Sequence, residues 1–251
     1  MVRVIMHGCN GRMGQFITKL VKEENNMEIV AGVDPFDSVK NDYPVFANIA
    51  DCNIEADVVI DFASNKAVDG LLDYCVNKNL PVVLCTTGLS EEQLNKVTKT
   101  SEKTAVLKSA NMSLGINLFM KLLKDAAPVL KEAGFDIEIV EKHHKMKKDA
   151  PSGTALALAD TINESLNNEY DYVFDRSDRS EARREKEIGI SAVRGGTIVG
   201  DHDVIFAGED EVITFSHTAY SRALFAKGAI AAAKFLAGKE SGFYTMQDVI
   251  G

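Results

Sequence analysis

The sequence predicts an α/β protein, made of a doubly wound parallel sheet and a second α+β domain with a mixed or antiparallel sheet. Up to about residue 110, short apolar runs alternate with amphipathic helical patterns, which is typical of parallel strands connected by helices. Between residues 188 and 217, three strand patterns follow one another with only short glycine-containing turns between them. Turns this short indicate antiparallel pairing, so a second domain of another class is expected.

The first domain is expected to contain five strands with helices between them. Each strand pattern is a short, almost continuously apolar run, as expected of strands covered on both faces. A capping box from Ser90 to Gln93 starts one of the helices, because the serine oxygen can accept from the Gln93 N–H while the glutamine side chain reaches back. The expected strands are 2–7, 29–33, 57–62, 81–85 and 104–108.

The character of the sequence changes near residue 112. A long helical pattern runs from residue 114 to Gly134, and Pro128 is expected to kink this helix or to end its first part. Residues 168–187 are polar and without periodicity, and a mobile solvated loop is favoured there over a specific anion site. The remaining patterns are a strand at 135–140, a helix at about 153–167, strands at 188–193, 198–207 and 212–217, and an alanine-rich helix around 224–236.

Composition excludes several classes of function. Lys and Arg number 28 against 37 Asp and Glu, a net charge of -9, which argues against a nucleic-acid partner and against binding to anionic membranes. No apolar run is long enough to span a bilayer, and the first residues form a strand pattern without signal-peptide features, so a cytoplasmic location is expected. The four cysteines stand singly, which favours reduced thiols over a zinc site or disulfides.

A glycine-rich turn joins the first strand to the first helix. Its pattern, Gly8-x-x-Gly11-x-x-Gly14, is weak by itself, but Asp34 ends the second strand twenty residues beyond Gly14. Glycines let the backbone approach a pyrophosphate, the helix N-terminus stabilises its charge, and the acid can bind a ribose 2′-hydroxyl. The sequence therefore predicts a Rossmann-type dinucleotide site.

The choice between NADH and NADPH rests on three residues. Asp34 would bind a free 2′-hydroxyl and repel a 2′-phosphate, and Pro35 after it offers no positive charge. Arg12 in the glycine turn could still reach a phosphate. NADH is thus slightly favoured and NADPH stays open.

Two further turns follow strand ends in the first domain. Residues 85–88 (Cys-Thr-Thr-Gly) and 109–112 (Ser-Ala-Asn-Met) lie just past the carboxyl ends of their strands, the edge where ligands bind in open α/β sheets. We expect both turns to line the nicotinamide half of the site, with ordinary βα turns as the alternative.

A positively charged stretch at residues 141–155 stands out in this acidic chain. It holds His143 and His144 with four lysines between 142 and 148, which suits a small anionic substrate. Ser152-Gly153-Thr154 starts a helix and offers backbone donors and a hydroxyl to a carboxylate. Adjacent histidines on a strand would point to opposite faces, so a metal site is not expected. A solvated run of charge is the alternative.

The same stretch resembles a known family. Glu141-x-His143-His144-x-x-Lys147-x-Asp149-Ala150-Pro151-Ser152-Gly153-Thr154-Ala155 is similar to the signature of the dihydrodipicolinate (4-hydroxy-tetrahydrodipicolinate) reductases of the diaminopimelate route to lysine. The resemblance covers the whole chain, and its other motifs are Gly8 to Gly14, Asp61-Phe62, Thr86-Thr87-Gly88, Asn111-x-Ser113-x-Gly115-x-Asn117, Arg194-Gly195, Ile198-Val199-Gly200-x-His202 and Ser221-Arg222.

The resemblance implies an NAD(P)H-dependent reductase of a small dicarboxylate. It implies that His143 is the acid/base group and Lys147 the proton donor, and that the substrate is bound by His144, Ser152, Gly153 and Thr154. The implied cofactor contacts are Gly8, Cys9, Asn10, Gly11, Arg12, Met13, Asp34, Phe62, Cys85, Thr86, Thr87, Ser109, Ala110, Asn111 and Met112.

The resemblance also implies the domain organisation and the assembly. The last helix, from about Arg222, would return to the cofactor domain, which gives domains 1–112 with 222–251 and 113–221. The second domain would bind substrate and build a homotetramer through its sheet. Two alternatives remain: another NAD(P)-dependent dehydrogenase of a small carboxylic acid, and a non-catalytic dinucleotide sensor.

Overall fold

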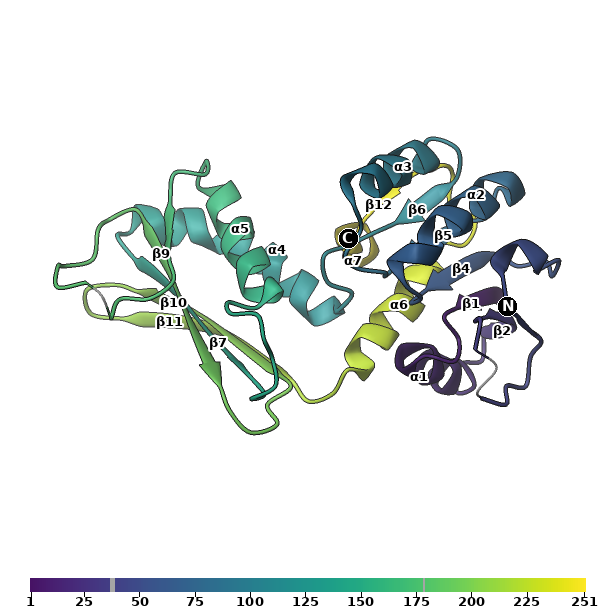
Figure 1. Ribbon diagram of the computed structural model, residues 1–251. Helices are drawn as coiled ribbons and strands as arrows, with labels where there is room; N and C mark the ends of the chain where they lie inside the picture. Colours follow the sequence, from purple (N-terminus) through teal and green to yellow (C-terminus); the bar gives the residue numbers. More distant parts are fainter. Residues whose placement is uncertain (37–38, 178) are drawn as a thin grey trace. The chain divides into compact units, whose positions relative to one another are not determined.

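The computed structural model describes residues 1–36, 39–177 and 179–251. The chain divides into two compact units (Figure 1): unit 1 consists of Met1–Leu114 and Ala223–Gly251, and unit 2 of Gly115–Arg222. The boundaries expected from the sequence were 112/113 and 221/222. Each unit has its own sheet and its own apolar core.

Unit 1 contains a seven-stranded sheet in the order β12-β6-β5-β4-β1-β2-β3, in which all neighbours are parallel. The predicted doubly wound parallel sheet is confirmed. The two outermost strands were not expected, because neither lies in a longer apolar run such as those that contain the equally short β5 and β6. The strands are β1 (Val2–His7), β2 (Met27–Val33), β3 (Val45–Phe46), β4 (Val58–Asp61), β5 (Val82–Leu84), β6 (Ala105–Leu107) and β12 (Gly242–Tyr244).

Helices cover both faces of this sheet. Val4 and Met6 of β1 belong to the core under α1 (Arg12–Val21) and α6 (Ala223–Leu236). Ile5, between them, belongs to the core under α2 (Val68–Lys78) and α3 (Glu91–Ser101). Successive side chains of a strand point to opposite faces, so an almost continuously apolar run buries both. The shorter elements are η1 (Ile49–Asp51), η2 (Asn65–Ala67) and α7 (Met246–Ile250).

The capping box at the start of α3 is confirmed. Gln93 N–H donates to Ser90 Oγ at 3.2 Å, and Ser90 N–H donates to Gln93 Oε1 at 3.2 Å. Two donors at the helix N-terminus that would otherwise lack partners are satisfied in this way.

Unit 2 contains a five-stranded mixed sheet in the order β11-β10-β7-β9-β8. Helices α4 and α5 pack on one face of it (Figure 1), where Ile137 and Ile139 of β7 are fully buried. The elements are α4 (Leu114–Glu132), β7 (Asp136–His143), α5 (Gly153–Ser165), β8 (Asp171–Val173), β9 (Glu187–Arg194), β10 (Gly200–Ala207) and β11 (Val212–Ala219).

The expectation that the last three strands pair consecutively was wrong for the first two. β10 and β11 are antiparallel neighbours, but β7 lies between β9 and β10 and runs parallel to β9. The turn after β9 crosses the end of β7: Gly195 N–H donates to the His143 carbonyl at 2.9 Å, and Lys145 N–H to the Gly196 carbonyl at 3.3 Å. Residues 195–199 are long enough to span the roughly 10 Å between strands on either side of a third.

Helix α4 continues past Pro128, so the alternative that this proline ends the helix is wrong. An interior proline removes a hydrogen bond and costs about 3 kcal/mol. One face of α4 is buried on both sides of the proline. Before it this face carries Ile116, Phe119, Leu123 and Ala127, and beyond it the partly buried Leu130. Burial of this apolar face offsets the cost of the interior proline. The helix is followed by Gly134, whose φ of 85° is typical of a residue just beyond a helix C-terminus.

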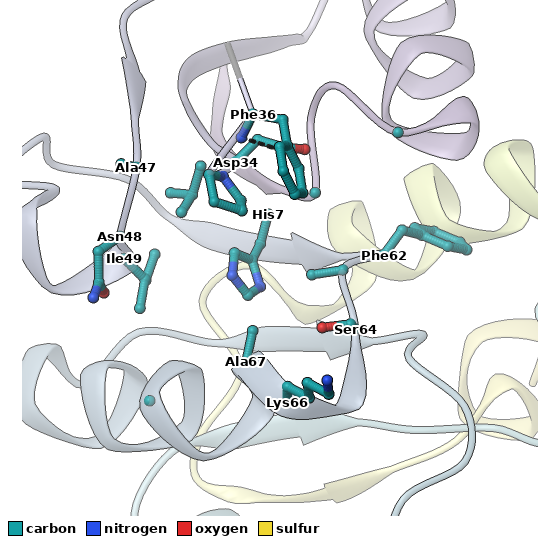
Figure 2. Close-up of a pocket in the computed structure, with 16 residues that line it drawn as sticks. His7, Asp34, Phe36, Ala47, Asn48, Ile49, Phe62, Ser64, Lys66 and Ala67 are labelled. Carbon is teal, nitrogen blue, oxygen red and sulfur yellow. Dashed lines mark hydrogen bonds between the residues drawn. The ribbon is translucent and has the colours of Figure 1, made fainter. Parts of the chain in front are cut away.

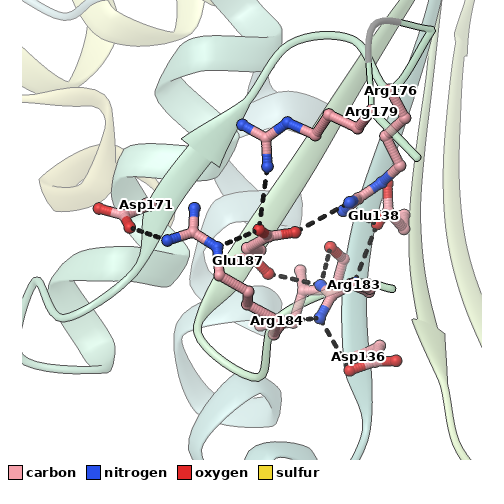
Figure 3. Close-up of polar contacts among 9 residues, drawn as sticks. Asp136, Glu138, Asp171, Arg176, Arg179, Arg183, Arg184 and Glu187 are labelled. Carbon is pink, nitrogen blue, oxygen red and sulfur yellow. Dashed lines mark hydrogen bonds and ion pairs between the residues drawn. The ribbon is translucent and has the colours of Figure 1, made fainter. Parts of the chain in front are cut away.

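Residues 168–187 were expected to form a mobile solvated loop, and most described residues between 174 and 186 are indeed exposed and outside helices and strands. The segment contains β8, and its arginines form ion pairs with acids of β7 and β9 (Figure 3). Glu187, whose side chain is 1% exposed, contacts Arg176 at 2.9 Å, Arg179 at 3.2 Å and Arg184 at 2.8 Å. Glu138 contacts Arg176 and Arg183, each at 3.1 Å. Residue 178 lies outside the described part of the chain.

These contacts shift the titration of Glu187. Burial by itself would raise the pKa of Glu187, but hydrogen bonds from Arg184 and Arg176 outweigh it and bring the pKa to about 2. A carboxyl group whose pKa is lowered in the folded protein stabilises the fold at pH values above its pKa in the unfolded chain, about 4.3 for glutamate. This contribution is lost as the pH falls toward 2.

Glu187→Gln is therefore expected to lower the melting temperature at pH 7, and the difference from wild type should shrink between pH 4.3 and pH 2. Thermal unfolding followed by circular dichroism across this range measures it, with Glu209→Gln, in an exposed turn, as the control. A difference that is the same at every pH would contradict the ion-pair account.

In the described part of the chain, no helix combines the length and the apolar character needed to cross a bilayer.

Candidate active site

The glycine turn of unit 1 is packed too tightly for side chains. Gly8 has a φ of 82°, and a Cβ there would lie 2.7 Å from the Phe62 carbonyl oxygen. A Cβ on Gly14 would lie 2.3 Å from the Gly8 carbonyl oxygen. Gly11 precedes α1 and has no side chain to cap it, so the N–H groups of the first turn are directed at whatever anion approaches.

Asp34 lies at the end of β2 and is oriented by two backbone donors. Asn10 N–H donates to Oδ2 at 3.1 Å, and Phe36 N–H donates to Oδ1 at 3.0 Å. Each carboxylate oxygen keeps a lone pair for a further donor such as a sugar hydroxyl. The orientation of the carboxylate is therefore fixed, and its contact with a ribose stays a prediction.

Asp34, Gly8, Gly11 and Phe62 line one pocket of about 480 Å³. Figure 2 shows this pocket between the end of β1, residues Ala47 to Ile49, and the start of α2. A pocket of this size, concave, mostly apolar and with few polar groups, is typical of small-molecule and cofactor sites. Four of the predicted cofactor residues are thus brought together.

Of the other predicted cofactor residues, Cys9 and Asn10 belong to the glycine turn and Arg12 and Met13 are the first residues of α1. The remaining ones belong to two turns at the same edge of the sheet. Residues 85–87 follow β5 and residues 109–112 follow β6, which neighbours it in the sheet. The side chains of Cys9 and Met112 are buried in the core, so only their backbone groups are left for a ligand. Ser109 Oγ accepts from Met246 N–H at 2.7 Å, which ties its turn to α7.

In unit 2, His143 ends the central strand β7 and is oriented by a buried carboxylate. Its Nδ1 lies 2.6 Å from Oε2 of Glu141, whose side chain is fully buried. Glu141 also accepts two parallel hydrogen bonds from Arg194, Nη1 to Oε2 and Nη2 to Oε1, each at 2.7 Å. Ser152 N–H donates to Oε1 at 2.9 Å.

These donors keep Glu141 ionised. Burial by itself would raise the pKa of Glu141, but the hydrogen bonds from Arg194 and His143 outweigh it and lower the pKa below its ordinary value. An ionised carboxylate accepts, so the hydrogen on His143 Nδ1 faces it and Nε2 is left for chemistry. Gly200 makes room for the ring, because a Cβ there would lie 3.0 Å from Nε2.

His202 of β10 completes the cluster. Its ring lies edge-on to that of His143 with centroids 5.2 Å apart, and its Nε2 lies 3.0 Å from Ser152 Oγ. Burial, with a contribution from His143, lowers the pKa of His202 to about 4, so this ring is neutral at pH 7. Ser152 Oγ also accepts from Ala155 N–H at 3.1 Å and so caps α5.

The predicted substrate residues are placed by this cap. The Ser152 side chain is buried and engaged with α5 and His202, which leaves it a role in shaping the helix start. Gly153 and Thr154 form the first turn of α5, where the helix dipole favours a negative charge. His144 follows the end of β7, so the two histidines do not share a strand.

Lys147 lies in the turn after β7, where its N–H donates to the His144 carbonyl at 3.0 Å. Its Nζ is 2.8 Å from Asp149 Oδ2, and the lysine side chain is 20% exposed. Lys145 and Lys148 are exposed. The turn therefore presents one lysine held in place by an ion pair and two that point to solvent.

Sequence reasoning assigned no role to Glu141, Arg194 or His202, although all three stand in the motifs of the family resemblance. Sheet register brings them together: His143 pairs with Arg194 across β7 and β9, and Glu141 with His202 across β7 and β10. An acid two residues before a histidine on one strand puts both side chains on the same face, and that spacing was the available signal for Glu141.

The fold and the two sites define a class of protein. A parallel sheet with a glycine turn and an acid after its second strand is a Rossmann-type dinucleotide-binding fold, and it is joined in this chain to a unit with an acid–base cluster, as in nicotinamide-dependent oxidoreductases. Residues 2–112 match the family model described as dihydrodipicolinate reductase, N-terminus, and residues 115–250 the model for its C-terminus. The chain belongs to the dihydrodipicolinate reductase family.

Known relatives are similar over the full length. The chain is 54% identical over 250 residues to a 4-hydroxy-tetrahydrodipicolinate reductase of Caldanaerobacter subterraneus subsp. tengcongensis, covering 100% of this chain and 98% of that protein. It is 52% identical over 246 residues to the enzyme of the same name from Clostridium tetani, covering 98% and 96%. A dipicolinate-bound dihydrodipicolinate reductase from Paenisporosarcina sp. TG-14 has a similar structure, with a TM-score of 0.83, 29% identity and full coverage of both chains.

Proposed function

We propose that the protein reduces the dehydrated form of 4-hydroxy-tetrahydrodipicolinate to tetrahydrodipicolinate with NADH or NADPH, in the diaminopimelate route to lysine. The observation that carries the proposal is the buried Glu141 carboxylate, which orients His143 beside the start of α5 in a chain of this family. An acid–base group next to a carboxylate-binding helix start suits a cyclic dicarboxylate.

The substrate would be held through its carboxylates. The first turn of α5, at Gly153 and Thr154, offers backbone N–H groups and the positive end of the helix dipole. In this proposal the His144 imidazole also contacts a substrate carboxylate. Holding the substrate by a carboxylate orients its ring so that one face can receive the hydride, and such orientation lowers the barrier of the step.

The bound nicotinamide supplies the hydride. When hydride adds to the conjugated imine of the ring, negative charge develops on its enamine side, and a proton must be delivered there to complete the reduction. The Lys147 ammonium, held by Asp149 at 2.8 Å, is the donor in this proposal. His143, with Nδ1 directed at Glu141, presents Nε2 as the second acid–base group.

In this proposal NADH is slightly preferred over NADPH. The Asp34 carboxylate lines the pocket and is fixed by two backbone donors, so a 2′-phosphate there would meet a like charge that cannot turn away. A free 2′-hydroxyl would instead donate to the remaining lone pairs of Asp34.

A coupled assay tests the function. Aspartate semialdehyde and pyruvate are condensed by the preceding synthase, the purified protein is added, and the oxidation of NADH and of NADPH is followed separately. We expect oxidation of both, faster with NADH at equal concentration. If neither cofactor is oxidised, the proposed reaction is wrong.

We further propose a cytoplasmic homotetramer assembled through the sheet of unit 2. Helices α4 and α5 pack on one face of this sheet, and the residues that point to its other face, such as Val140, Ser191 and Ile205, belong to no core cluster. The four cysteines in their free form suit a reducing compartment. Light scattering coupled to gel filtration should give about four times the chain mass of 27.4 kDa.

A further inference from the structure

His7, the last residue of β1, lines the same pocket as Asp34. The histidine is 5% exposed, and its Nδ1 lies 2.7 Å from Oδ1 of Asp61, its neighbour across β1 and β4. Figure 2 shows the ring in the pocket, between Asp34 on one side and Ala67 on the other. The glycine turn, which begins at Gly8, explains the backbone of this region but gives no function to the His7 side chain.

Asp61 is a fully buried carboxylate that acts only as an acceptor. Thr86 Oγ1 donates to Oδ2 at 2.6 Å, and Ala63 N–H donates to Oδ1 at 3.2 Å. With these donors around it, the carboxylate accepts from His7 Nδ1 as well, so the ring carries its hydrogen on Nδ1. Nε2 is the ring nitrogen that remains.

Within residues 1–36, 39–177 and 179–251, nothing forms a hydrogen bond with His7 Nε2. His7 Nε2 is not among the buried side-chain atoms that lack a partner, so it is open to the pocket that His7 lines. Because Nδ1 is bonded to Asp61, the imidazole is held with Nε2 in this position. A fixed acceptor that lines a ligand-sized pocket indicates a group that meets a ligand.

We propose that His7 Nε2 accepts a hydrogen bond from the adenosine half of the bound dinucleotide, with Asp61 and Thr86 as positioning residues behind it. The inference rests on the proposed function, since it names a further contact in the same cofactor site. An adenosine carries the donors that such an acceptor needs, the ribose hydroxyls and the adenine amino group. Asp34 and His7 would then both contact this half of the dinucleotide.

Two substitutions test the contacts of the two ring nitrogens, Nδ1 and Nε2, independently. His7→Asn places an amide nitrogen near the position of Nδ1, so it keeps the bond to Asp61 and removes the group that lines the pocket. His7→Gln places its amide near the position of Nε2, so it keeps a group in the pocket and gives up the bond to Asp61. Titration calorimetry with NADH and with ADP-ribose measures binding, and thermal unfolding measures the integrity of unit 1.

We expect His7→Asn to lower the affinity for NADH and for ADP-ribose by the same factor, about 3- to 10-fold, which corresponds to the loss of one hydrogen bond. His7→Gln should bind both within about twofold of wild type but melt at a lower temperature. Unchanged ADP-ribose binding by His7→Asn, or equal weakening by both variants, would overturn the inference. A wild-type protein that binds no dinucleotide would instead overturn the proposed function.

Discussion

Lys147→Ala is expected to lower kcat about 10²- to 10⁴-fold, the usual contribution of a positioned general acid. The lysine lies in the turn after β7 and is held by Asp149, whereas the cofactor pocket is built from unit 1. NADH binding should therefore stay within about twofold of wild type. Steady-state kinetics in the coupled assay and calorimetry with NADH measure the two quantities.

Two further variants decide what kind of group Lys147 is. Lys148→Ala removes an exposed lysine of the same turn and should leave kcat within about twofold, which controls for the local positive field. Lys147→Arg keeps the charge, but its guanidinium does not give up a proton near neutral pH. Activity retained by Lys147→Arg would show that the site needs a charge at this position and not a proton donor.

Glu141→Gln should destabilise the protein by roughly 3–5 kcal/mol, because Arg194 would lose its ionic partner and the amide would place a donor against a donor. It should also lower kcat more than it raises KM, since His143 would lose the carboxylate that orients it. Urea unfolding and steady-state kinetics test both effects. Glu209→Gln, in an exposed turn of the same unit, is the matched control.

A double-mutant cycle measures the interaction energy between Glu141 and Arg194 apart from their other contacts. If Glu141 and Arg194 act as one ion pair, Glu141→Gln combined with Arg194→Met should cost less than the sum of the single changes. Additive losses, or a loss below about 1 kcal/mol for Glu141→Gln alone, would contradict a stabilising role for the pair.

Local patterns in the sequence predicted much of unit 1. The glycine turn after β1 and the capping box of α3 each depend on residues a few positions apart, so their geometry can be inferred directly. The parallel sheet follows from alternating strands and helices. The edge strands β3 and β12 do not lie in apolar runs that would have marked them, and they form because a neighbouring strand offers unpaired backbone groups.

Non-local pairing explains what was missed in unit 2. The arginines between residues 176 and 184 looked solvated because one of their acidic partners, Glu138, lies nearly forty residues earlier in the chain. The candidate active site of unit 2 likewise depends on pairing between residues far apart in the sequence. Residues 141–155 are contiguous and were identified together, whereas Arg194 and His202 reach them only through the register of β9 and β10 against β7.

The central position of β7 also has a consequence for hydrogen exchange. β7 is paired with β10 on one side and β9 on the other, whereas β8 and β11 have one neighbour each in the described sheet. Its amides can exchange only when the sheet around them opens, so they should be among the slowest in unit 2, and those of β8 and β11 should exchange sooner. The acid–base group at the end of β7 would then be carried by the part of the unit that opens least often, and its geometry would persist between turnovers.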